Sequence, residues 1–112
     1  MSVTIYHNPK CSKSRQTLAL LQENGVEPEI VEYLKSPPSA AQLKAVISKL
    51  GVSPREIMRG KEAKEEGIDA ALEGDELIAA IVAHPRALER PIVVKGDKAA
   101  IGRPPESVLE IL

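Results

Sequence analysis

The chain has 112 residues, of which 43% are hydrophobic and 28% are charged, and its formal net charge is −1. This length suits one domain around a single core, and the composition is that of an ordinary soluble globular protein. The charge gives no broad basic field, and the only aromatic side chains are those of Tyr6 and Tyr33. These features argue against nucleic acid as a partner and predict an aliphatic core.

Cys11 is the only cysteine, so the chain cannot form an intramolecular disulfide. The sequence does not begin with a basic and then apolar signal segment, and no apolar run is long enough to span a bilayer. We therefore expect a cytoplasmic monomer that does not contact membranes. With two histidines and one cysteine, we expect neither a metal site nor a bound cofactor.

The first third of the chain predicts a strand, a helix and a second strand. Residues 3–6 favour a strand, and a helix is expected over residues 12–24, with Leu21 on its apolar face and Gly25 as its stop. Residues 29–34 predict the second strand. A strand, helix and strand in this order can pair in parallel through a right-handed crossover.

The middle of the chain predicts helices. Leu43, Val46 and Ile47 repeat at helical spacing, Ser39 is a candidate N-cap, and the charged run 61–66 is expected to be a solvated face. Pro85 after His84 is interpreted as a helix terminator. The expected segments are residues 40–50, residues 54–59, short surface turns within 60–74, and residues 75–83.

The last third predicts a strand over residues 89–94 and a partner strand over residues 98–101. Gly96-Asp97 between them suits a two-residue type II′ hairpin turn, and a final helix should carry Val108. The fold class is therefore α/β, with a four-stranded mixed sheet flanked by helices. The whole chain is expected to be one domain, with a helical insertion at about residues 39–84 between the two halves of the sheet.

Cys11 stands between the first predicted strand and the first predicted helix. The free N–H groups of a helix N-terminus and the helix dipole favour an anion, so such a site can lower the pKa of a cysteine to roughly 3.5–7.5. Lys10, Lys13 and Arg15 act in the same direction. The alternative is that Cys11 is a small buried hydrophobe, but no apolar residue lies beside it among Lys10, Ser12 and Lys13. The local chemistry favours a nucleophile next to an anion-binding helix end.

Several short motifs are spread along the chain. They are His7-Asn8-Pro9-x-Cys11-x-x-Ser14-Arg15, Ser53-x-Arg55-x-x-x-Arg59, His84-Pro85, Arg90-Pro91-Ile92-Val93-Val94 and Gly102-Arg103-Pro104. With these motifs in this order, the sequence resembles the glutaredoxin-coupled arsenate reductase family, which has a thioredoxin-like fold. The resemblance covers essentially the whole chain. Because Ser12 and Lys13 stand where the best-known members carry Gly-Thr, the chain is most similar to the arsenate-reductase-related members with a Cys-Ser-Lys-Ser loop.

The resemblance implies a role for each matching residue. Cys11 would be the catalytic nucleophile that attacks arsenic. His7 and Ser14 would tune it, with Arg15 beside them, and Pro91 would be a cis-proline next to the cysteine. Three arginines would bind the oxyanion substrate: Arg59, Arg90 and Arg103.

Each of these residues also has a purely structural interpretation. An arginine considered singly is surface charge, although its planar fork matches an oxyanion well. His7 is equally expected to bond the loop backbone, and Ser14 to be an ordinary first-turn residue whose hydroxyl can also reach the cysteine. Pro91 in a trans peptide bond is the base-rate expectation.

The resulting functional hypothesis is a cytoplasmic arsenate reductase in arsenic detoxification. It would depend on glutathione as the co-substrate reductant and on glutaredoxin, because the chain has no second cysteine to resolve an adduct on Cys11. One alternative is a monothiol glutathione-dependent oxidoreductase acting on another small oxyanion or on mixed disulfides. Another is a non-enzymatic regulator that binds RNA polymerase, which Ser14 disfavours because such regulators generally carry Cys-x-x-Cys.

Overall fold

The computed structural model describes residues 2–89 and 91–112, and these divide into two compact units. One, here called the sheet unit, comprises residues 1–36 and 90–112. The other, here called the helical unit, comprises residues 37–89. The expectation of a single domain with an insertion at about residues 39–84 stays a prediction.

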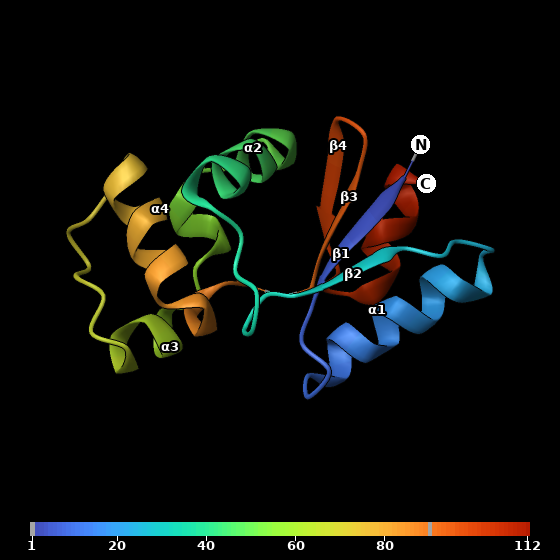
Figure 1. Ribbon diagram of the computed structural model, residues 1–112, viewed down its shortest axis with the longest axis horizontal. Coiled ribbons are helices and arrows are strands. Elements are labelled where there is room, and N and C mark those ends of the chain that lie inside the picture. The colour runs from blue at the N-terminus through green and yellow to red at the C-terminus, as the bar shows by residue number, and fades with distance from the viewer. Residues whose placement is uncertain (1, 90) are drawn as a thin grey trace. The chain divides into compact units, whose positions relative to one another are not determined.

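The sheet unit contains four strands: β1 (Val3–His7), β2 (Glu29–Glu32), β3 (Ile92–Lys95) and β4 (Lys98–Ile101). Their order in the sheet is β2-β1-β3-β4, so β2 and β4 are the edges (Figure 1). β1 runs parallel to β2 and antiparallel to β3, and β3 and β4 are antiparallel. The predicted α/β class with a four-stranded mixed sheet is therefore confirmed.

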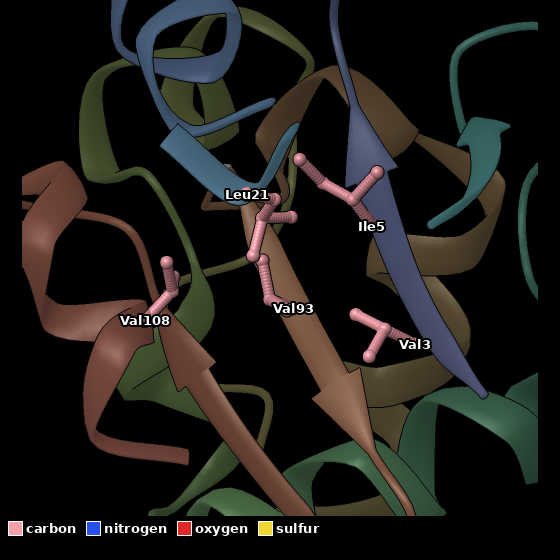
Figure 2. Close-up of a cluster of buried hydrophobic side chains, with 5 residues drawn as sticks. All are labelled: Val3, Ile5, Leu21, Val93 and Val108. Atoms are coloured by element: carbon pink, nitrogen blue, oxygen red, sulfur yellow. The ribbon is translucent and has the colours of Figure 1, made fainter. Parts of the chain in front are cut away.

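An aliphatic cluster holds α1 (Ser12–Glu23) and the 3-10 helix η3 (Pro105–Ile111) against the sheet. Alternate residues of β1 are buried, as the two-residue period of a strand requires. The cluster consists of Val3, Ile5, Leu21, Val93 and Val108 (Figure 2). Burying each of these side chains stabilises the fold by about 1.5–3 kcal/mol, so the cluster fixes where α1 lies relative to the end of β1.

Three predicted elements of the sheet unit differ from the structure. The strand predicted over residues 89–94 is β3, which begins at Ile92, and Glu89 lies outside it because its N–H donates to the Ile57 carbonyl. β2 ends at Glu32, before the predicted limit at Leu34, because the Glu32 carbonyl accepts the N–H groups of Lys35 and Ser36 and the chain turns there. The final helix is a 3-10 helix rather than an α-helix. The hairpin agrees with the prediction: Gly96 has a φ of 60° and Asp97 does not have a positive φ, the combination that a type II′ turn requires.

The helical unit contains α2 (Ala40–Leu50), η1 (Pro54–Ile57), α3 (Gly60–Glu65), α4 (Gly74–Ala83) and η2 (Pro85–Ala87). α2 has the predicted limits. Its N-cap is Ser39, whose hydroxyl accepts the Gln42 N–H at 3.1 Å while the Gln42 side chain accepts the Ser39 N–H at 2.9 Å. The helix ends at Gly51, whose φ of 71° is one that glycine adopts without strain.

The predicted helix over residues 54–59 stops early. η1 ends at Ile57, and the chain then pairs with the segment after η2. The Glu89 N–H donates to the Ile57 carbonyl at 2.6 Å, and the Arg59 N–H donates to the Ala87 carbonyl at 2.7 Å. This short ladder fixes the backbone at Arg59.

The expectation that residues 61–66 form a solvated face is wrong at two positions. Glu62 in α3 is only 8% exposed, because its carboxylate pairs with Arg59. Ala63 beside it is also buried. Within residues 2–89 and 91–112, no helix is both long and apolar enough to cross a membrane.

Candidate active site

Cys11 is the N-cap of α1, directly after the loop that follows β1. Its backbone is extended, with φ −93° and ψ 123°, and its N–H donates to the Asn8 carbonyl at 3.0 Å. The thiol is partly exposed. The first-turn N–H groups of a helix lack partners within the helix, and the first turn of α1 holds no acidic side chain. This electrostatic setting favours a thiolate or another anion.

The loop before Cys11 is held by its own polar groups. The Asn8 carboxamide oxygen accepts the Lys10 N–H at 3.0 Å, and the Arg15 guanidinium donates to the Pro9 carbonyl at 2.9 Å. Asn8 is buried, although its neighbours Pro9 and Lys10 are exposed. Both bonds set the path of the loop, and the path of the loop determines where the sulfur lies.

His7 and Ser14 connect the end of β1 to the first turn of α1. His7 Nδ1 lies 2.6 Å from Ser14 Oγ, which also accepts the Asn8 N–H at 3.0 Å. His7 is 6% exposed and Ser14 is fully buried. The Ser14 hydroxyl therefore has a structural function in closing this loop. The further idea that it donates to the Cys11 thiolate stays a prediction.

Burial lowers the pKa of His7 below its ordinary value of 6.5. The Arg15 charge lowers this pKa further, whereas the Glu32 carboxylate opposes the shift. Glu32 pairs with His7 in the register of β1 and β2, and the two residues line one pocket of about 250 Å³. The shift favours a neutral imidazole, in which one ring nitrogen donates and the other accepts.

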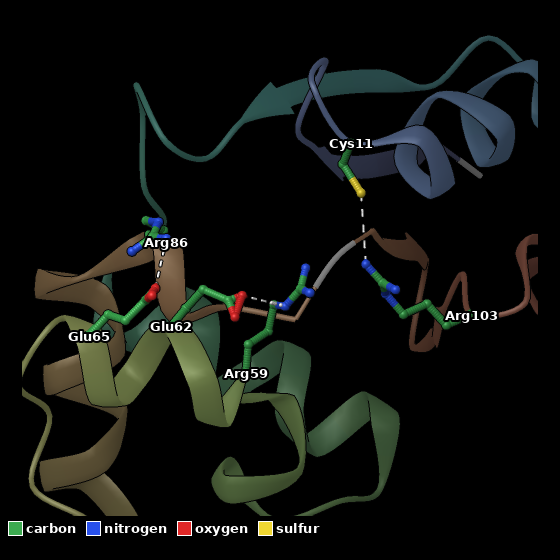
Figure 3. A network of polar contacts seen from close by, with 6 residues as sticks. All are labelled: Cys11, Arg59, Glu62, Glu65, Arg86 and Arg103. Carbon is green, nitrogen blue, oxygen red and sulfur yellow. Dashed lines mark hydrogen bonds and ion pairs between the residues drawn. The ribbon is translucent and has the colours of Figure 1, made fainter.

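Arg103 supplies a cation at the sulfur. Its Nη2 lies 3.8 Å from Cys11 Sγ (Figure 3). Arg103 comes just after β4, where its N–H donates to the Ile101 carbonyl at 2.9 Å and its peptide bond to Pro104 is cis. A guanidinium at this position favours the thiolate, and its remaining N–H groups can bind an oxyanion next to the sulfur.

Gly102 allows β4 to approach Pro91 and α1 closely. Its N–H donates to the Pro91 carbonyl at 2.9 Å. A Cβ atom at this position would lie 2.5 Å from Thr17 Oγ1 and 2.8 Å from Pro91 Cγ. Any side chain here would push apart the segments that carry Arg103 and the start of α1.

The structure thus brings six of the predicted site residues into the sheet unit: Cys11, Arg103, His7, Ser14, Arg15 and Pro91. Arg59 lies in the helical unit as the N-cap of α3, where its Nε contacts Glu62 Oε2 at 2.9 Å. Its predicted place beside the cysteine stays a prediction. Arg90, and with it the predicted cis bond to Pro91, lies outside the described residues.

Sequence reasoning did not assign roles to Asn8, Glu32, Gly102 or Glu62. The Asn-Pro pair of the loop, with Lys10 two positions after Asn8, was a usable signal for an Asx turn. The proximity of Glu32 to His7 becomes evident once the two strands are put in register. The ion pair of Glu62 becomes evident once Arg59 is placed three residues before it at the start of a helix. Gly102 stands in the Gly102-Arg103-Pro104 motif, but its close approach to Thr17 and Pro91 is evident only in the structure. Among the residues that the structure describes, no three His, Cys, Asp or Glu side chains cluster as metal ligands would.

The mixed sheet with a cysteine at the N-terminus of its first helix defines a thioredoxin-like protein, as predicted. The chain belongs to the ArsC family, whose model matches residues 6–111. It is 57% identical to the uncharacterized protein YfgD of Escherichia coli, over 98% of this chain and 96% of that one. It is 50% identical to an arsenate reductase of Haemophilus influenzae, over all of both chains.

A solved structure agrees with this assignment. The arsenate reductase from Vibrio cholerae is 51% identical and has a TM-score of 0.93, over all of this chain and 98% of the other. The predicted family is therefore confirmed. The closer relation to members with a Cys-Ser-Lys-Ser loop stays a prediction.

Proposed function

We propose that this protein is an oxidoreductase that reduces arsenate to arsenite. Relatives named arsenate reductase align over the full length of the chain at about half identity, which supports this activity. The observation that carries the proposal is the contact between Arg103 Nη2 and Cys11 Sγ at 3.8 Å, because it joins a nucleophile to an oxyanion-binding cation.

The proposed reaction begins with the Cys11 thiolate. Its sulfur forms a bond to the pentavalent arsenic of arsenate, and one arsenate oxygen leaves as water after protonation. A glutathione thiolate then attacks the Cys11 sulfur. The electron pair of the S–As bond passes to arsenic, which becomes trivalent and leaves as arsenite. Cys11 and glutathione are joined in a mixed disulfide, so the two electrons gained by arsenic come from two sulfur atoms.

An external thiol is required because the chain has no second cysteine. Glutaredoxin would accept the glutathione from Cys11 and return the free thiol. A reduced cysteine is needed for each turnover, which suits the reducing environment of the cytoplasm. The proposed co-substrate and partner are thus glutathione and glutaredoxin.

The arginines would bind and neutralise the oxyanion. Arg103 already lies at the sulfur, and Arg59 and Arg90 would complete the cationic set. Fixed donors that face developing negative charge lower the barrier most when they need not reorganise. His7 and Ser14 would hold the loop so that the sulfur faces the same oxyanion.

Purified protein with arsenate, glutathione, glutaredoxin, glutathione reductase and NADPH tests the proposal through NADPH consumption. We expect arsenate-dependent consumption that Cys11→Ser abolishes. Ser12→Ala is the matched control, because it changes the neighbouring exposed residue and leaves the thiol. Equal consumption by Cys11→Ser would contradict the mechanism.

The same assay separates the alternatives. A glutathionylated peptide consumed in place of arsenate would favour the monothiol oxidoreductase. No turnover of either substrate, together with recovery of RNA polymerase on immobilised protein, would favour the regulator.

A further inference from the structure

The guanidinium of Arg59 is paired with a buried carboxylate in the helical unit. Its Nε lies 2.9 Å from Glu62 Oε2, and the two side chains are 27% and 11% exposed (Figure 3). Arg86 and Glu65 have the same separation, but their side chains are 52% and 44% exposed. A carboxylate withdrawn from water depends much more on its cation than a surface carboxylate does.

Arg59 is also fixed through its backbone. Its N–H donates to the Ala87 carbonyl at 2.7 Å, and its own carbonyl accepts the Ala63 N–H at 2.8 Å. The contact with Glu62 is made at Nε, and the guanidinium carries two further nitrogens, Nη1 and Nη2, at its outer edge. This outer edge is a planar fork of the kind that binds two oxygens of an oxyanion.

From this arrangement we infer that Glu62 is a positioning residue of the oxyanion site. It fixes the direction of the Arg59 guanidinium and offsets part of its charge. The inference rests on the proposed function, in which Arg59 holds the substrate oxyanion. An oxyanion next to Arg59 would be repelled by the Glu62 carboxylate and would be bound less tightly, which speeds its release.

The variant Glu62→Gln separates two effects of Glu62, the positioning of the Arg59 guanidinium and the negative charge of the carboxylate. The glutamine keeps an acceptor for Nε–H but carries no charge, so Arg59 should stay in place and bind oxyanions more tightly. We expect about three- to tenfold tighter binding, on the order of what one charge about 4 Å away contributes when water fully screens it. Glu65→Gln on the same helix is the matched control, since it makes the same change in net charge.

The binding measurement follows the Nε–H resonance of Arg59 by NMR while phosphate is added to the full-length protein. In the wild type the resonance should shift and saturate, and Glu62→Gln should saturate at about three- to tenfold lower phosphate. Glu65→Gln should match the wild type. Equal affinities of the wild type and Glu62→Gln would overturn the inference, as would a resonance that phosphate does not shift.

Steady-state kinetics give a second readout. Glu62→Gln should lower the KM for arsenate by a similar factor without raising kcat, a split that a merely destabilised fold would not produce. If Glu62→Gln does not fold, Glu62→Asp takes its place, because it keeps the charge and shortens the reach. Glu62→Asp should then weaken phosphate binding about threefold or more, and unchanged binding would overturn the inference.

The two proposals fail in different ways. If phosphate binds at Arg59 as expected but no variant consumes arsenate, the proposed function is wrong and the role of Glu62 stands. If arsenate is reduced but Glu62→Gln changes neither the KM nor phosphate binding, the role of Glu62 is wrong and the function stands.

Discussion

At the scale of single residues, reactivity depends on what surrounds one sulfur atom. Cys11 has an extended backbone at the N-terminus of α1 and a guanidinium nitrogen 3.8 Å from its sulfur. The loop that carries it is tied by His7, Asn8 and Ser14. The charge near the sulfur and its position are thus supplied by different residues, and mutations can separate them.

Arg103→Gln removes the cation at the sulfur. We expect the rate of Cys11 alkylation at neutral pH to fall, and kcat/KM for arsenate to fall about 10- to 100-fold, because hydrogen bonds to charged groups contribute about 1.5–3 kcal/mol. Iodoacetamide trapping with mass spectrometry and the NADPH assay measure the two effects. Arg86→Gln, at a surface arginine paired with Glu65, is the control. Equal decreases of the alkylation rate and of kcat/KM in both variants would show that Arg103 does not act on Cys11 or on the substrate.

His7 predicts a dependence of stability on pH. Since folding lowers its pKa from 6.5, the unfolded chain takes up the proton first as the pH falls. The free energy of unfolding should therefore decrease as the pH drops through about 6.5, until the folded protein is also protonated. Urea unfolding of the wild type and His7→Asn at pH 8, 7, 6 and 5 measures this decrease, which should be smaller in the variant. Parallel curves would contradict the prediction.

At the scale of elements, the site depends on where β1, α1 and β4 meet. The aliphatic cluster on one face of the sheet holds α1 against β1 and β3. Gly102 then lets the end of β4 reach Thr17 of α1. Arg103 follows immediately, so the position of this arginine depends on a glycine that has no chemical function of its own.

Gly102→Ala should destabilise the protein by about 1–3 kcal/mol, because the added methyl group overlaps Thr17 and Pro91. Gly60→Ala is the matched control, since a Cβ atom there has no neighbour within 4 Å and the residue lies in a helix. It should be neutral or slightly stabilising. Thermal unfolding of the two variants measures the difference, and similar melting temperatures would contradict the packing argument.

The elements that were predicted well have strong local signals. α2 shows both a capping box and a helical stripe, and its limits agree with the structure. The position of Cys11 at the start of α1 follows from the change of period around residue 11. Local signals do not extend to long-range packing. The burial of Glu62 depends on its ion pair with Arg59, and β2 is short because the chain turns at Glu32. Neither feature is encoded in the periodicity of the sequence.

At the scale of the whole molecule, the chain divides into a sheet unit and a helical unit. The sheet unit holds the cysteine and Arg103, and the helical unit holds Arg59 and its carboxylate partner. Sequence periodicity predicted the helices of the second unit. That residues 37–89 form a compact unit depends on contacts between residues far apart in the chain, which periodicity does not encode.

Because each chain has one cysteine, Cys11 can form a disulfide only with a thiol of another molecule. Glutathione disulfide should therefore convert the protein to a form that carries one glutathione on Cys11, and glutaredoxin should reverse it. Intact-mass spectrometry measures both steps, with Cys11→Ser as the control. Conversion mainly to disulfide-linked dimers would contradict the expectation that glutathione is the co-substrate.

The edge of the sheet has a consequence for how the protein behaves in crowded solution. An exposed edge strand offers its backbone to other chains, and long flat edges are where aggregation begins. β2 has only four residues and carries a glutamate at each end, Glu29 and Glu32. A second copy of the chain could form only a few backbone hydrogen bonds with β2, and its own glutamates would be repelled by these two negative charges. The short strand and its two glutamates thus make β2 a poor template for pairing with another chain, even though Ile30 is 47% exposed.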